Sequence, residues 1–232
     1  MYEGTRGPGK TDALLMDFAR DIGRGLGVDW RGVLFRRTYL ELGDVIEKSK
    51  KWFPRIFAGA QYNETEHFWR FRDGEALLLR QFERDSDYDK YHGHAYPWIG
   101  WEELCNWPND VPFTSMISTN RSANPHVRKR IRATANPYGV GHNWVKLRFR
   151  LPIPPGRIVG PVIADALDRE GKPTHHRVVV HGDLSENKIL LFADPNYEQT
   201  IGAAAKNESQ LKAWKRGDWD VVAGGMFDDV WR

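Results

Sequence analysis

Residues 4–11 read Gly4-Thr5-Arg6-Gly7-Pro8-Gly9-Lys10-Thr11 and carry the strongest signal in the sequence. It satisfies the pattern G-x-x-x-x-G-K-[ST], in which the glycines let successive backbone N–H groups turn toward phosphate oxygens. All eight residues are therefore candidates for nucleotide binding. Lys10 is expected to reach the β- and γ-phosphates, and the Thr11 hydroxyl to hold Mg²⁺. The alternative is a glycine-rich turn that happens to contain Lys-Thr.

The pattern has meaning only between a strand and a helix, and a helix is expected to follow it. Leu14, Leu15, Phe18 and Ile22 repeat at helical spacing, and Gly23 is expected to end the helix. The helix N-terminus would then face the phosphates. Arg6 lies inside the loop, where it is either a catalytic group that stabilises charge on the transferred phosphoryl group or a salt-bridged loop residue.

Composition sets wide limits on the protein class. The chain has 232 residues, which suits one large domain or a domain with a subdomain. Lys and Arg total 34 against 31 Asp and Glu, so the net charge of +3 is compatible with a nucleic-acid partner without indicating one. Cys105 is the only cysteine, which excludes an intrachain disulfide. No apolar run approaches the roughly 20 residues of a membrane span, so we expect a soluble, unexported protein.

A second landmark, at residues 96–104, reads YPWIGWEEL. It predicts a strand that delivers two carboxylates, which is what metal-dependent nucleotide hydrolysis requires beside a phosphate loop. The spacing gives Glu102 the metal-binding role and Glu103 the role of polarising the attacking water. Paired acids on a solvated face are the alternative.

A third landmark is the stretch Ala133-Thr134-Ala135-Asn136-Pro137. Thr134, Ala135 and Asn136 at the tip of a strand could sense the γ-phosphate and relay its loss, or form a plain turn into Pro137. Arg121 lies in a polar loop as an exposed charge or as a finger that reaches into another subunit.

Other segments give a coarse secondary structure. We expect a strand at 33–35, whose end at Arg36, Arg37 and Thr38 lies near the nucleotide or a DNA track, or is merely solvated. Pro54 is expected to stop a helix at 39–53. The remaining expectations are a hairpin of 66–71 and 75–82 around Asp73-Gly74, a linker at 151–156, a strand at 178–180 and a helix at 203–216 closed by 217–219. The histidines do not form a convincing zinc set.

The three landmarks, in this order, resemble the large terminase subunit of tailed phages. The similarity extends to residues 34–38, 143–144, 214–220 and 224–227. The resemblance implies an α/β P-loop NTPase fold of the ASCE/RecA-like type, with a mostly parallel central sheet flanked by helices and a small C-terminal lid subdomain. It makes residues 4–11 the Walker A loop, Glu102 and Glu103 the Walker B acids, and Thr134-Ala135-Asn136 the motif that couples hydrolysis to movement.

The resemblance further implies an organisation and a set of partners. Residues 1–150 would be the ATPase core, 151–215 the lid and the return to the core, and 216–232 a linker, with Asp228 and Asp229 as linker residues rather than nuclease ligands. The implied cofactors are ATP and Mg²⁺. The implied partners are double-stranded DNA, a portal protein, a small terminase subunit and further copies of the chain in a ring on the procapsid, in the cytoplasm of the bacterial host and without a membrane.

Two departures from the family pattern affect these expectations. Glu102 stands where relatives often have Asp, and the family's C-terminal nuclease domain, with its nuclease activity, is not expected here. The region that grips adenine in the family is not expected either, so we expect a nucleotide held mainly by its phosphates with weak base discrimination. A P-loop phosphotransferase acting on a small molecule and a catalytically inert assembly module remain as alternatives. DNA contact is expected through basic segments such as Arg128-Lys129-Arg130.

Overall fold

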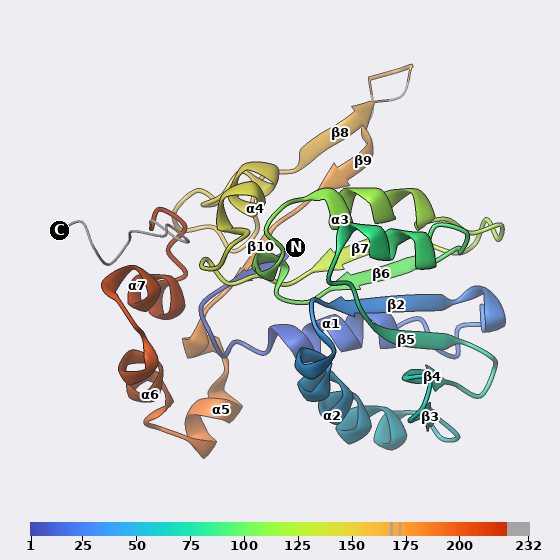
Figure 1. Ribbon diagram of the computed structural model, residues 1–232, viewed down its shortest axis with the longest axis horizontal. Helices are drawn as coiled ribbons and strands as arrows, with labels where there is room; N and C mark the ends of the chain where they lie inside the picture. Colours follow the sequence, from blue (N-terminus) through green and yellow to red (C-terminus); the bar gives the residue numbers. More distant parts are fainter. Residues whose placement is uncertain (168, 172, 222–232) are drawn as a thin grey trace. The chain divides into compact units, whose positions relative to one another are not determined.

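The computed structural model describes residues 1–167, 169–171 and 173–221 (Figure 1). The chain divides into two compact units. The first unit comprises Met1–Lys10, Glu103–Asn109 and the chain from Thr134 onward, and the second comprises Thr11–Glu102 and Asp110–Ala133. The sequence similarities at residues 224–227 and the expectations for Asp228 and Asp229 lie outside the described residues.

The second unit is built on a six-stranded sheet with the order β3-β4-β5-β2-β6-β7 (Figure 1). Its strands are β2 (Arg31–Arg36), β3 (Gln61–Asn63), β4 (Phe68–Arg70), β5 (Ala76–Gln81), β6 (Trp98–Trp101) and β7 (Arg130–Ala133). β2 pairs in parallel with β5 and β6, and β6 pairs in parallel with β7. β4 pairs antiparallel with both β3 and β5. The sheet is therefore mostly parallel, as predicted.

The expected hairpin and buried strand are confirmed. Phe68 pairs with Leu78 and Arg70 with Ala76, and Gly74 at the turn has a φ of +101°. Five of the six residues of β2 are buried, as expected of a strand with neighbours on both edges and layers on both faces.

Helices pack on this sheet through a core rich in aromatic side chains. The helices are α1 (Lys10–Ala19), α2 (Tyr39–Ile56), α3 (Val111–Ser115) and the 3-10 helices η1 (Gly27–Asp29), η2 (Asp85–Lys90) and η4 (Met116–Thr119). Phe18 of α1 lies with its ring centroid 5.5 Å from that of Trp30 and 5.4 Å from that of Trp98. A side chain at Gly32 would collide with Phe18, so the helix packs directly on the β2 backbone.

Pro54 does not stop α2, contrary to the expectation. The helix begins at the Thr38 N-cap, in a capping box with Glu41, and runs through Pro54 to Ile56. Proline removes only its own N–H donor and crowds the preceding turn, so a last turn can still close after it. Here Phe57 N donates to Phe53 O at 2.8 Å, and Phe53 is fully buried, which holds that turn in place.

The first unit contains short strands and the C-terminal helices. β1 (Tyr2–Gly4) pairs in parallel with β10 (Val180–Gly182), and Tyr2 also makes an isolated parallel bridge with Thr134. β8 (Ile163–Leu167) pairs antiparallel with β9 (Pro173–Arg177). The helices are α4 (His142–Phe149), α5 (Lys188–Ala193), α6 (Tyr197–Ala204), α7 (Glu208–Arg216) and the 3-10 helices η3 (Leu104–Asn106) and η5 (Leu184–Glu186).

Two expectations for the later residues need correction. The helix expected at 203–216 is two helices, because Asn207 accepts a bond from Gln210 N at 2.8 Å and so caps α7. Gly217 ends α7 with a φ of +63°, as predicted. The strand expected at 178–180 is displaced, since only Val180 of those residues belongs to a strand. In the described part of the chain, every helix is too short or too polar to span a membrane.

Candidate functional site

The phosphate-loop motif begins at a close backbone approach in the first unit. Gly4 has a φ of +125°, and a Cβ atom there would lie 2.1 Å from Gly182 O. Only glycine fits this position. Thr5 N donates to Gly182 O at 3.1 Å, which continues the pairing of β1 with β10 into the loop.

Gly9 lies at an open part of the loop. Its φ is +87°, and no atom lies within 4 Å of the position that a Cβ would take. The positive φ, rather than a close neighbour, is what favours glycine here. Pro8, directly before it, contributes no N–H donor to a phosphate site.

Lys10 links the loop to a residue far along the chain. Its side chain is buried, and its Nζ donates to Asn136 Oδ1 at 2.7 Å, to Gly4 O at 3.5 Å and to Thr5 O at a short distance. The lysine of the first landmark and the amide of the third are thus in direct contact. The ammonium group is held over the loop by acceptors that phosphate oxygens could replace.

Glu103 is connected to the same group of residues. Its backbone N–H donates to Thr134 Oγ1 at 2.9 Å, and Asn106 Nδ2 donates to Glu103 Oε2 at 3.3 Å. Leu104 N donates to Thr134 O at 2.8 Å, and Ala135 N donates to Tyr2 O at 3.1 Å. Thr134 and Ala135 therefore tie the acid to the strand that leads into the phosphate loop.

The backbone of Glu103 is in the left-handed region, with a φ of 54°. This conformation is rare for a residue with a side chain and costs on the order of 1 kcal/mol. The hydrogen bonds that Glu103 N and Leu104 N donate to Thr134 compensate for this conformational cost. The turn redirects the chain immediately after Glu102, so the two adjacent acids have different surroundings.

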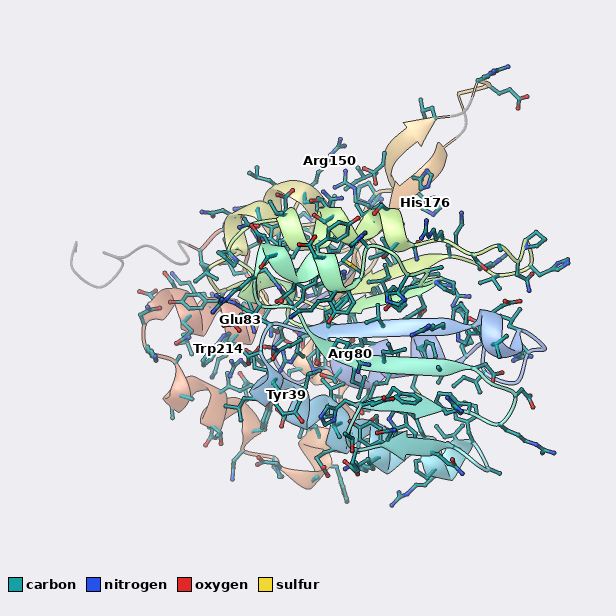
Figure 2. The ribbon with its side chains drawn as sticks, turned by 45° about the vertical axis from the view of Figure 1, so that its right-hand side comes forward. Tyr39, Arg80, Glu83, Arg150, His176 and Trp214 are labelled. Atoms are coloured by element: carbon teal, nitrogen blue, oxygen red, sulfur yellow. The ribbon has the colours of Figure 1, made fainter. Side chains whose placement is uncertain are left out.

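Arg6 lies against a tryptophan. Its guanidinium carbon is 3.5 Å from the centroid of the Trp214 ring on α7, which Figure 2 labels, and Arg6 N donates to Trp214 O at 2.9 Å. Burial lowers the pKa of Arg6, and the nearby Glu103 opposes that shift. Neither sequence-based alternative for Arg6 included this stacking, because Trp214 lies about two hundred residues away in sequence.

Glu102 belongs to the second unit, at the carboxyl end of β6. It is buried, and its Oε2 lies 3.4 Å from Arg36 Nε, whose N–H also donates to Glu41 O at 3.2 Å. Thr11, the second residue of α1, belongs to the same unit. A hydroxyl and a carboxylate are oxygen ligands of the kind that Mg²⁺ prefers together with substrate phosphates. Among the described residues, no cluster of three or more His, Cys, Asp or Glu suited to a metal is found.

The other predicted basic residues differ in their surroundings. Arg121 is exposed and donates to Gly93 O at 3.2 Å. Arg128 and Lys129 are exposed, but Arg130 is buried and its guanidinium lies 2.5 Å from Asp21 Oδ2. Arg130 is therefore a structural ion-pair residue of the second unit.

Glu3 is a buried residue beside the loop that the sequence analysis did not single out. Its Oε1 accepts from His181 Nδ1 at 2.9 Å and its Oε2 from Trp219 Nε1 at 2.6 Å. The bond to Glu3 raises the pKa of His181. A carboxylate in a buried strand needs hydrogen-bonding partners. This requirement is the one sequence signal that could have pointed to Glu3. Beside Glu3 is a cavity of about 340 Å³ lined in part by His181, Arg157 and Arg216.

Asn187 and the α5–α6 segment also contact the loop without any local sequence signal. Asn187 Nδ2 donates to Gly7 O at 2.6 Å. A Cβ at Gly7, which has a φ of +90°, would lie 2.7 Å from Leu184 Cδ1 and 2.9 Å from Tyr197 Cε1. Within the first unit, the phosphate loop is therefore in close contact with residues 184–214.

Comparison with known proteins gives structural matches alone. No protein-family model and no curated protein matches the sequence. The large terminase of a thermophilic bacteriophage, solved in complex with ADP, matches 100% of this chain with a TM-score of 0.66 and 15% identity. The chain spans about half of that protein, 50% of its length.

Two isolated ATPase domains match as well. The large terminase ATPase domain of Thermus phage P74-26 matches 92% of this chain and 86% of its own length, with a TM-score of 0.51 and 12% identity. The N-terminal domain of the DNA packaging ATPase of bacteriophage phi29 matches 81% of this chain and 91% of its own, with a TM-score of 0.53 and 14% identity. The predicted fold class is confirmed: the chain has the α/β fold of the ATPase domains of phage large terminases.

Proposed function

We propose that this chain is an ATP-hydrolysing domain of a DNA-packaging terminase. The observation that carries the proposal is the contact between Lys10 Nζ and Asn136 Oδ1, which joins the first and third sequence landmarks. Thr134, two residues before Asn136, is bonded to Glu103 of the second landmark. A glycine-rich turn without function would give no reason for these three landmarks to converge.

The proposed site uses residues 4–11 to bind the phosphates of ATP. Lys10 exchanges its bonds to Gly4 O, Thr5 O and Asn136 for bonds to phosphate oxygens, and Glu103 orients a water molecule and accepts its proton. Thr11 and Glu102 would hold Mg²⁺, which supplies charge neutralisation on the phosphates. Two nucleotide-bound structures of the matching phage terminase, with ADP and with ATP-γ-S, support the choice of ligand.

Arg6 is the proposed source of positive charge for the transition state. Its guanidinium is half-buried against Trp214, and partial desolvation strengthens its interaction with an anion. Arg121 from a neighbouring copy is the second candidate, and its exposure makes it accessible to another molecule. Mutating each arginine and measuring turnover of the assembled protein identifies which one acts.

Asn136 is proposed to sense the nucleotide. Asn136 and the loop carbonyls accept hydrogen bonds from the same Lys10 ammonium group. A phosphate that attracts Lys10 therefore weakens its bond to Asn136 and frees the 134–136 segment to shift. This would connect hydrolysis to movement of double-stranded DNA, in a homo-oligomeric ring on a portal protein, with a small terminase subunit as a further partner. A phosphate-contact mode of DNA binding predicts a steep loss of affinity with added salt.

The test of the proposed function is the ATPase rate of the chain and of Lys10→Ala, with and without DNA. We expect the substitution to lower turnover roughly 100-fold or more, because a preorganised cation at the phosphates is lost. Unchanged turnover in Lys10→Ala would show that the motif is wrongly assigned. Calorimetric titration with Mg-ATP separates the alternatives, since an inert assembly module would not bind and a phosphotransferase would bind but need an acceptor.

A further inference from the structure

We propose that Asn187 is a positioning residue of the phosphate loop. Its side-chain amide makes two bonds with different partners: Oδ1 accepts from Leu190 N at 3.1 Å and Nδ2 donates to Gly7 O at 2.6 Å. The first bond caps α5, and the second fixes the loop. A backbone N–H requires an acceptor and a backbone carbonyl a donor, so the two bonds define the amide orientation without ambiguity.

The peptide that Asn187 holds has a single hydrogen-bonding group. It joins Gly7 to Pro8, and proline has no N–H, so the Gly7 carbonyl is the group through which this peptide can be oriented. Gly7 has a φ of +90°. Because glycine has no Cβ, its backbone has many accessible conformations when it is unrestrained. A donor on this carbonyl selects one of them.

The surroundings show that the contact is built into the fold. Leu184, Leu190 and Tyr197 approach Gly7 so closely that a Cβ there would lie 2.7–3.2 Å from their side chains. These residues pack with Trp214 in the apolar cluster of the C-terminal helices. The loop peptide is thus half-buried against apolar groups on one side, where an unmade hydrogen bond carries a cost.

The consequence concerns Gly9 and Lys10, whose N–H groups follow the held peptide. By fixing the Gly7–Pro8 peptide, Asn187 keeps the loop in one arrangement and reduces the conformational entropy lost when phosphates bind. Asn187 does not touch the nucleotide in this scheme. The inference rests on the proposed function in one respect, namely that the ligand of the loop is Mg-ATP.

The experiment compares Asn187→Ser with Asn207→Ser in the full chain. Serine is a good N-cap, so both variants keep their helix caps, but its hydroxyl is too short to reproduce the second bond of the amide. Asn207 is a matched control because it has the same two kinds of bond: its Oδ1 caps α7 by accepting from Gln210 N, and its Nδ2 donates to Tyr138 OH at 3.3 Å. Hydrogen exchange of residues 4–10 is measured without nucleotide, and Mg-ATP affinity is measured by calorimetry.

For Asn187→Ser we expect loop exchange to be faster and Mg-ATP affinity weaker, each by roughly three- to ten-fold, as the loss of one hydrogen bond predicts. Asn207→Ser should leave both at wild-type values. Equal loop exchange in the two variants would overturn the inference, whatever the protein binds. Failure of the wild-type chain to bind Mg-ATP would instead overturn the proposed function, while faster loop exchange in Asn187→Ser would still support the positioning role.

Discussion

The two units of the chain are stabilised by different kinds of contact. The second unit has an aromatic core under a six-stranded sheet, in which rings from α1, β6 and the intervening loops meet edge to face or stacked. In the first unit, Lys10 Nζ and Asn187 Nδ2 donate hydrogen bonds to carbonyl groups of the phosphate loop, and Arg6 N of the loop donates to Trp214 O. Glycines in positive-φ conformations complete the loop. Substitutions in the second unit should therefore act mainly on stability, whereas those around the loop should act on nucleotide handling as well as on stability.

The largest effect on stability is expected for Phe18→Ala in the second unit. Phe18 is fully buried between Trp30, Trp98 and Phe71, so the substitution leaves a cavity and should cost about 3–5 kcal/mol of unfolding free energy. Urea denaturation followed by circular dichroism measures it. A cost under about 1 kcal/mol would mean that the aromatic cluster does not carry the stability of this unit.

The ion pair between Arg36 and Glu102 bears on both stability and nucleotide handling, because it joins a core position of the second unit to a predicted metal ligand. Arg36→Met removes the cation beside a buried carboxylate and should destabilise the chain by about 3 kcal/mol. Arg37→Met is the matched control, since Arg37 is more exposed, and it should change stability little. Equal melting temperatures for the two variants would show that the pair contributes nothing.

Gly7 and Gly9 provide a matched pair within the loop. Both have φ near +90°, but alanine at Gly7 meets Leu184 and Tyr197, whereas alanine at Gly9 meets open space. We expect Gly9→Ala to cost about 1 kcal/mol from backbone strain, and Gly7→Ala about 2–3 kcal/mol from strain and collision together. Chemical denaturation of both variants isolates the contact between the loop and residues 184–197. Equal costs would place that contact in doubt.

A smaller, pH-dependent effect is expected at Glu3 and His181. Because Glu3 raises the pKa of His181 above its unfolded value near 6.5, the pair stabilises the folded state fully below that value, and the contribution is lost as pH rises through the folded-state pKa. The melting temperature of the wild type should exceed that of His181→Asn by about 2 °C at pH 5.5, and the gap should narrow by pH 9. Burial lowers the pKa of His142, which opposes stability in acid, but this acts equally on both proteins and cancels in the difference. A gap that widens with pH would contradict the assignment.

The sequence was sufficient for the local elements of the second unit. The buried run at β2 and the Asp73-Gly74 turn carry their signals within a few residues, and both are confirmed. Pro54 was misjudged because tertiary packing of Phe53 outweighed the local cost of a proline. The break between α6 and α7 was missed because asparagine is neutral in a helix interior unless its side chain caps the next turn.

The candidate site was predictable only as separate motifs. The motifs make Lys10, Glu103 and Thr134-Ala135-Asn136 candidate site residues, but no local pattern specifies that Lys10 contacts Asn136. The stacking of Arg6 on Trp214 and the bond from Asn187 to Gly7 depend on how residues about two hundred positions apart come together, which a single sequence does not encode in any short-range signal.

If the phosphate loop and Glu103 hydrolyse ATP, as proposed, Glu103→Gln should abolish the reaction without abolishing binding. The amide keeps the shape of the side chain but cannot accept a proton, so we expect Mg-ATP affinity within about three-fold of wild type and a turnover lower by roughly 10²- to 10⁴-fold. The two values are obtained from one preparation, by calorimetry and by phosphate release. Wild-type turnover in Glu103→Gln would contradict this proposal.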